Sequence, residues 1–188
     1  MQQATSSVLT AWSNFYVITA SAAAGLTGLM FVVITLVAGN RARETTHVGV
    51  STFSTPTVVH FGAALLVSAI LTAPWRSLIY VAVLVGLTGI SGVVYVARVM
   101  VRTKRLTAYR AQIDDWIWYT ILPLVAYVAI GVVAIVLPAV PAGVLFVLAG
   151  AVLLLIFIGI HNAWDIVTYI IVEQPPSSSP PEPPSEGP

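Results

Sequence analysis

The sequence predicts an all-α integral membrane protein, a bundle of five transmembrane helices in a chain of 188 residues. Apolar residues make up 58% of the chain and charged residues 8%. Soluble domains carry roughly 25% charged residues, so this composition cannot cover a water-facing globule. The mean hydropathy of +0.95 indicates the same class. Five apolar stretches reach the length of about 20 residues with which a helix crosses a bilayer, and they set the number of spans.

The predicted membrane domain covers residues 15–172 and follows a short extracytoplasmic segment, residues 1–14. That segment has no Lys or Arg and no small-residue cleavage site, so we do not expect a removable signal peptide. The last apolar run is too long for one straight crossing, which favours a tilt or an interfacial extension. The expected spans are 15–38, 54–75, 78–101, 116–138 and 142–164, the last with a helical extension to residue 172.

Prolines mark where these helices end or bend. Pro74 lies in the tight link between the second and third spans, and Pro138 and Pro141 lie between the fourth and fifth. Proline suits such links because it lacks a backbone donor. We expect Pro56 to be tolerated in the first turn of the second span and Pro123 to kink the fourth.

The distribution of Lys and Arg predicts the orientation. Under the five-span arrangement, seven of the eight basic residues fall in or beside the first and third connections, and only Arg76 falls on the other side. Cytoplasmic loops are enriched in Lys and Arg, which places the N-terminus outside and the C-terminus in the cytoplasm. The tail, residues 173–188, is rich in Pro, Ser and Glu and is expected to be disordered.

Small residues on two spans predict helix packing. In lipid, close backbone approach and interhelical hydrogen bonds hold helices together, and small side chains allow that approach. We expect the faces on the first and third spans to contact each other within the chain, with a homodimer contact as the alternative. These faces consist of Ala24, Gly25 and Gly28 on the first span and Gly86, Gly89 and Gly92 on the third.

Three ionisable residues at membrane depth are the candidate site. His60 lies in the second span on a polar, small stripe with Thr57, and His161 and Asp165 are one turn apart on the fifth, with Asn162 between them. The two spans run in opposite directions, so all three ionisable residues are expected at one level near the cytoplasmic face. Ionisable side chains within a membrane are costly enough to mark function by default.

Several roles fit this cluster. A purely structural polar cluster is favoured, ahead of a proton or ion relay and ahead of haem or divalent-metal binding by the histidines. No cofactor is therefore expected. Asp115 is expected mainly to cap the fourth span, with support of the cluster as a second role.

A basic group at the third connection sets topology and is also able to attract anionic lipid headgroups. It consists of Arg98, Arg102, Lys104, Arg105 and Arg110.

Composition and motifs exclude several classes of function. The chain has no cysteine, and it contains no nucleotide-binding, serine-hydrolase or zinc-protease motif, so no catalytic residue is assigned. No stretch of the sequence combines basic residues with aromatic ones in a water-facing domain, so we do not expect the protein to bind nucleic acid. The sequence predicts a non-enzymatic accessory or regulatory subunit that works through helix contacts with a membrane protein or with itself. The alternative is a proton-conducting, ion-conducting or cofactor-binding subunit.

Three short runs carry a resemblance to known sequences. They are TFSTPTVVHF at residues 52–61, IGIHNAWD at 158–165 and AGLTG at 24–28. These runs resemble those of a family of small five-span bacterial inner-membrane proteins without an established function. The resemblance covers the spans and excludes the tail. It implies a multi-pass protein of the bacterial inner membrane and supplies no activity or catalytic residue.

Overall fold

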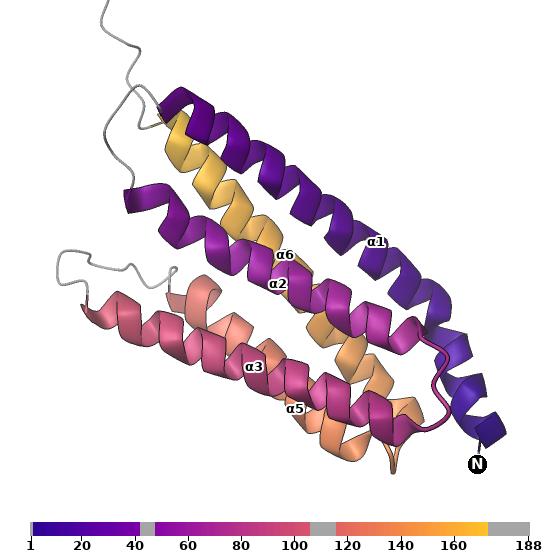
Figure 1. Ribbon diagram of the computed structural model, residues 1–188. Helices are drawn as coiled ribbons and strands as arrows, with labels where there is room; N and C mark the ends of the chain where they lie inside the picture. The colour runs from indigo at the N-terminus through magenta and orange to yellow at the C-terminus, as the bar shows by residue number, and fades with distance from the viewer. Residues whose placement is uncertain (1, 42–47, 106–115, 173–188) are drawn as a thin grey trace, which may run out of the picture.

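The computed structural model describes residues 2–41, 48–105 and 116–172, which are helical apart from two short links at 73–77 and 137–140 (Figure 1). Side chains are described for residues 8–35, 56–101 and 116–168, apart from 166. The elements are α1 (Gln2–Arg41), α2 (Val48–Thr72), α3 (Leu78–Arg105), the π-helical turn η1 (Ile117–Ile121), α5 (Leu122–Val136) and α6 (Pro141–Val172).

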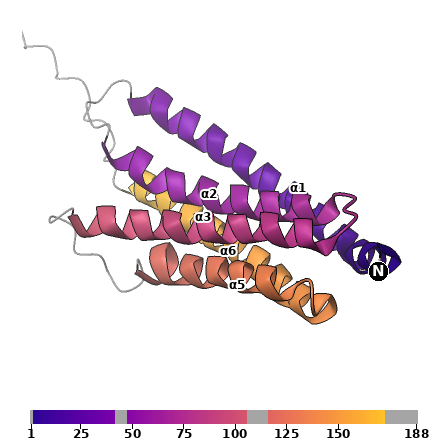
Figure 2. The same cartoon turned by 60° about the horizontal axis from the view of Figure 1, so that its bottom comes forward.

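The helices form one bundle in which consecutive helices run in opposite directions (Figures 1 and 2). α1 packs along α2, α2 along α6, α6 along α5, and α5 along α3. This order leaves α1 at one edge of the bundle, away from α3 and α5. The C-terminal ends of α1, α3 and α6 lie at the end opposite the N-terminus (Figure 1).

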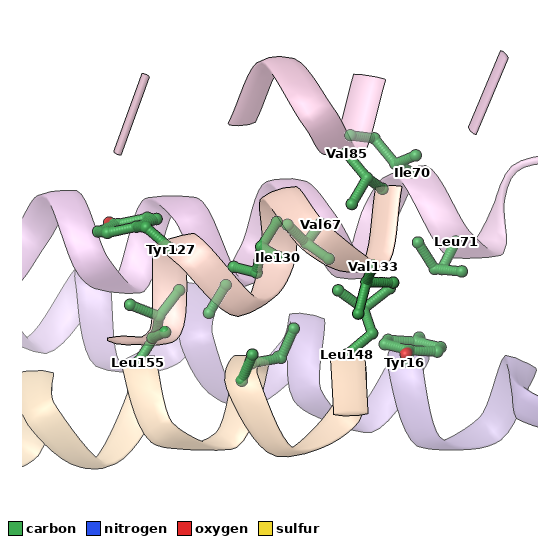
Figure 3. Close-up of a cluster of buried hydrophobic side chains, with 14 of the residues drawn as sticks. Tyr16, Val67, Ile70, Leu71, Val85, Tyr127, Ile130, Val133, Leu148 and Leu155 are labelled. Carbon is green, nitrogen blue, oxygen red and sulfur yellow. The ribbon is translucent and has the colours of Figure 1, made fainter. Parts of the chain in front are cut away.

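The core is apolar and draws on every helix of the bundle (Figure 3). Tyr16 of α1, Leu71 of α2 and Leu148 of α6 are among its largest fully buried side chains. Many equally large apolar side chains face outward instead, such as Ile135 and Phe146. A soluble protein would bury such residues, whereas a helix in lipid exposes them at no cost.

Within the described residues, four segments are long and apolar enough to cross a membrane: Val8–Thr35, Leu78–Val101, Ile117–Val136 and Pro141–Asp165. The chain is therefore a polytopic membrane protein. A further apolar segment, Pro56–Thr72 of α2, is shorter in the part of the chain for which side chains are described.

Two helix starts differ from the expected positions. α1 begins at Gln2 rather than near Phe15, because neither proline nor glycine interrupts the chain before Gly25. α2 begins at Val48, so Pro56 lies inside the helix, and its predicted place in the first turn is wrong. At the other end of the chain, α6 reaches Val172, the length that the apolar run predicted.

A π-helical turn precedes Pro123, the position at which the sequence predicts a kink. Pro123 is the second residue of α5 and has no backbone N–H, and the turn before it widens so that the Leu122 N–H bonds to the Ile117 carbonyl. Widened turns of this kind arise where the regular hydrogen-bond ladder is interrupted. η1 places Trp118 against α6, as described below.

The glycines of α3 form a close helix contact, and their partner is α5. A Cβ added at Gly89 would lie 2.8 Å from the Gly131 backbone nitrogen, and one at Gly86 would lie 3.3 Å from the Ala134 Cβ. One at Gly92 would overlap the Tyr127 ring. The small face of α3 is thus a packing surface, as its sequence predicted.

The small face of α1 behaves differently. Ala24, Gly25 and Gly28 are exposed, and a Cβ added at either glycine would meet no heavy atom of the described residues within 4 Å. The predicted contact of these residues with the third span is wrong. α1 instead turns its Tyr16, Thr19 and Ala23 side inward, where the Thr19 and Ser68 hydroxyls form a 2.9 Å hydrogen bond to α2.

Candidate functional site

His60 is buried in the bundle and bonded to a tyrosine. Its side chain is 1% exposed, and its Nδ1 lies 3.0 Å from the Tyr127 hydroxyl of α5. The Tyr95 ring of α3 stands edge-on to the imidazole at a centroid distance of 6.4 Å. The residues at helical spacing along α2, Thr57, Ala64 and Ser68, are also buried. This stripe therefore points into the bundle, and His60 joins α2 to α5.

His161 and Asp165 form a second group at the end of α6. The His161 Nδ1 lies 3.2 Å from an Asp165 carboxylate oxygen, an ion-pair distance without hydrogen-bond geometry. Trp118 of η1 stacks flat on the imidazole, with ring centroids 3.8 Å apart and planes 6° apart. Both ionisable side chains are partly exposed, at 35% and 42%. An exposed pair of this kind contributes little stability by itself, since water screens it.

The predicted cluster is thus arranged as two groups with different neighbours. His60 faces the tyrosines of α3 and α5, whereas His161 faces Asp165 and the tryptophan of η1. Among the residues that the structure describes, no three His, Asp or Glu side chains gather closely enough to hold a metal ion.

Thr57 and Asn162 are buried polar residues with unused hydrogen-bonding atoms. Both are 0% exposed, and among the described residues neither the Thr57 hydroxyl nor the Asn162 amide has a hydrogen-bond partner. The Phe61 ring packs where a Cβ on Gly159 would stand, which fixes the register of α2 against α6. Because these helices run in opposite directions, Thr57 and Asn162 each lie about one turn from that contact, on the same side of it. Burying an amide without a hydrogen-bond partner costs free energy. The level of Thr57 and Asn162 in the bundle therefore suits a small ligand that forms hydrogen bonds.

The remaining predicted residues are placed only in part. Arg98 is exposed on α3. Arg110, Asp115 and the tail, 173–188, lie outside the described residues. The backbone of α3 includes three more basic residues whose side chains lie outside the described set: Arg102, Lys104 and Arg105.

The sequence reasoning missed Tyr127 and Trp118, the side chains that contact the two histidines. Tyr127 carried a usable signal. It stands well inside an apolar span, whereas tyrosine in membranes is enriched at the interface, and a buried hydroxyl needs a partner. Trp118 carried no comparable signal, because its position looked like an ordinary interfacial anchor.

The His60–Tyr127 bond predicts a measurable coupling. Tyr127→Phe leaves the His60 Nδ1 unpaired, and His60→Phe leaves the hydroxyl unpaired. A double-mutant cycle on unfolding in detergent should give a coupling energy of about 0.6–1.7 kcal/mol, the range found between membrane helices. The control is Tyr16→Phe combined with His60→Phe, since Tyr16 bonds the distant Leu145 carbonyl and should not couple. A zero coupling for the first pair would contradict the bond.

Comparison with models of protein families, with curated proteins and with solved structures found no match for the chain. The resemblance to small bacterial inner-membrane proteins therefore stays a prediction. Three features of the described residues bear on function. They are four membrane-spanning segments, a buried histidine–tyrosine hydrogen bond and an exposed glycine face on α1.

Proposed function

We propose that this protein is a non-enzymatic accessory or regulatory subunit of the bacterial inner membrane, and that α1 docks on a transmembrane helix of another protein. One observation carries the proposal. No described residue covers the small face around Gly25 and Gly28, whereas the other small face of the chain, on α3, is a close helix contact.

α1 has the surface that such a role needs. Of the four long apolar segments it is the least buried, because it packs mainly on α2 at the edge of the bundle. Ser21, Ala24, Gly25 and Gly28 follow one another at helical spacing on its exposed side. Small residues make few dispersion contacts with lipid, but they let a second helix approach closely. The pair α3 and α5 illustrates that use in this same chain.

The proposal is tested with a photo-crosslinking amino acid placed at position 28 in native membranes. The matched control is position 157, where Phe157 is 63% exposed on α6. The two positions lie at similar depth, because α1 and α6 run in the same direction and the Tyr16 hydroxyl contacts the Leu145 carbonyl. We expect one discrete protein adduct from position 28 and only lipid adducts from position 157.

The mass of the adduct separates the alternatives. The chain has a mass of 19.9 kDa, so an adduct of twice that mass identifies a second copy rather than a different protein. Lipid adducts alone at position 28 would contradict the proposal, and so would an adduct with a second copy only. Gly25→Leu in the same chain should abolish the adduct, because the added side chain fills the face.

A proton relay is the second candidate, and the buried polar residues of α2 and α6 favour it. His60, Thr57 and Asn162 are all buried, and Thr57 and Asn162 have hydrogen-bonding atoms without a partner in the described part of the chain. Purified protein in liposomes with an imposed pH gradient should then dissipate that gradient, and His60→Phe should abolish the flux while Tyr16→Phe retains it. An unchanged gradient with the wild-type chain would exclude the relay.

We propose no resident cofactor. An absorption spectrum and elemental analysis of the purified protein test this point, because haem or a stoichiometric metal ion would contradict it.

The proposed topology places the tail in the cytoplasm. Seven of eight basic residues lie at the connections on that side under a five-span arrangement. A reporter that is active only in the cytoplasm should be active when fused after Val172, and the same reporter fused after Arg76 should be silent. The opposite pattern would overturn the orientation, and activity at both sites would overturn the number of spans.

A further inference from the structure

A groove opens between α2 and α3 on the lipid-facing side of the bundle. It has a volume of about 590 Å³. α3 follows α2 directly in the chain but packs mainly on α5, so the two helices leave a space between them. The walls are mostly apolar, and the Tyr127 ring lies among the lining residues beside Gly92. Gly62 of α2 also lines the groove, and a Cβ added there would meet nothing within 4 Å.

One end of the groove carries a positive charge. Arg98 is among its lining residues and is exposed, and within the described residues no acidic side chain pairs with it. Arg98 stands near the C-terminal end of the membrane segment Leu78–Val101, at headgroup level. A guanidinium at that level binds phosphate oxygens with two parallel hydrogen bonds.

The length of the groove matches one leaflet of a bilayer. Its lining residues on α3 run from Leu87 to Arg98, which is about 16 Å of helix at 1.5 Å per residue. Half of a hydrocarbon core about 30 Å thick is about 15 Å. An acyl chain that starts from a phosphate on Arg98 therefore reaches the far end of the groove, beside Leu87, near the middle of the membrane.

We propose that this groove is a binding site for one anionic phospholipid, with an acyl chain between α2 and α3 and the headgroup phosphate on Arg98. The acyl chain contacts the apolar wall and the ring of Tyr127, whose hydroxyl is hydrogen-bonded to His60. The site favours a lipid with net negative charge, because no carboxylate among the described residues neutralises the charge of Arg98. This site is independent of the α1 face.

The test is native mass spectrometry of the full chain in detergent, titrated with phosphatidylglycerol or phosphatidylcholine of identical acyl chains. The wild type should bind one phosphatidylglycerol more tightly than phosphatidylcholine. Arg98→Gln should weaken phosphatidylglycerol binding by about fivefold and remove the preference. Gly62→Phe should fill the groove and weaken both lipids at least tenfold.

Gly150→Phe is the matched control, because Gly150 is also exposed and open but lies on α6, away from the groove. It should bind both lipids like the wild type, and all three variants should keep the wild-type melting temperature. Equal binding by wild type and Gly62→Phe would overturn the site. A preference that survives Arg98→Gln would overturn the headgroup assignment. A wild-type dimer that Gly62→Phe disperses would identify a second copy as the occupant and overturn the lipid.

Discussion

Gly89→Leu is expected to lower the free energy of unfolding in detergent by about 3 kcal/mol or more, at or beyond the upper end of the range for overpacked cores. The reason is the identity of the neighbour. A Cβ at Gly89 would lie 2.8 Å from a backbone nitrogen of α5, so no side chain can rotate away and the helix itself has to move. Thermal unfolding of purified protein measures the loss.

Gly28→Leu is the control for this change. Both substitutions gain the same helix propensity, about 1 kcal/mol over glycine, so their difference isolates packing. A Cβ at Gly28 meets nothing within 4 Å, and the isolated chain should be as stable as the wild type or slightly more stable. Equal effects from the two variants would mean that α3 and α5 do not pack as described.

Phe61→Ala is expected to have a comparably large effect. The Phe61 ring is 1% exposed and occupies the space above Gly159, where it fixes α2 against α6. Truncating a buried phenylalanine costs about 3–5 kcal/mol, and we expect the lower end of this range because the unfolded side chain remains in an apolar medium. The measurement is again unfolding in detergent.

Phe157→Ala provides the comparison for Phe61→Ala. Phe157 lies on α6, two residues from Gly159, and is 63% exposed. Its truncation leaves no internal cavity and should change the unfolding free energy by less than about 0.5 kcal/mol. A small effect for Phe61→Ala, equal to that for Phe157→Ala, would show that α2 and α6 are not joined at this contact.

The class of fold was predictable because it depends on local composition. Runs of apolar residues broken by proline define the helices, and the glycines of α3 mark a close contact whatever helix supplies the other side. The hydropathy of the sequence did not predict the start of α1, because the residues before Val8 are mostly polar. They continue the helix all the same, since no proline or glycine interrupts it there.

The pairing of helices was not predictable in the same way. Two glycine faces, on α1 and α3, look alike in sequence, and nothing local indicates that α5 covers one and that the other stays open. The same limit applies to the candidate site. Depth placed His60 and His161 at one level, but the rotation of α2 and α6 decides their neighbours, Tyr127 for one and Trp118 for the other.

The central claim is that the open face of α1 holds the helix of a different membrane protein. The most direct test is the mass of the complex extracted from native membranes in lipid nanodiscs without detergent. The wild-type chain of 19.9 kDa should emerge with one further polypeptide, and Gly28→Leu should emerge alone while keeping its stability. A wild-type chain that emerges alone, or only with copies of itself, would contradict the claim.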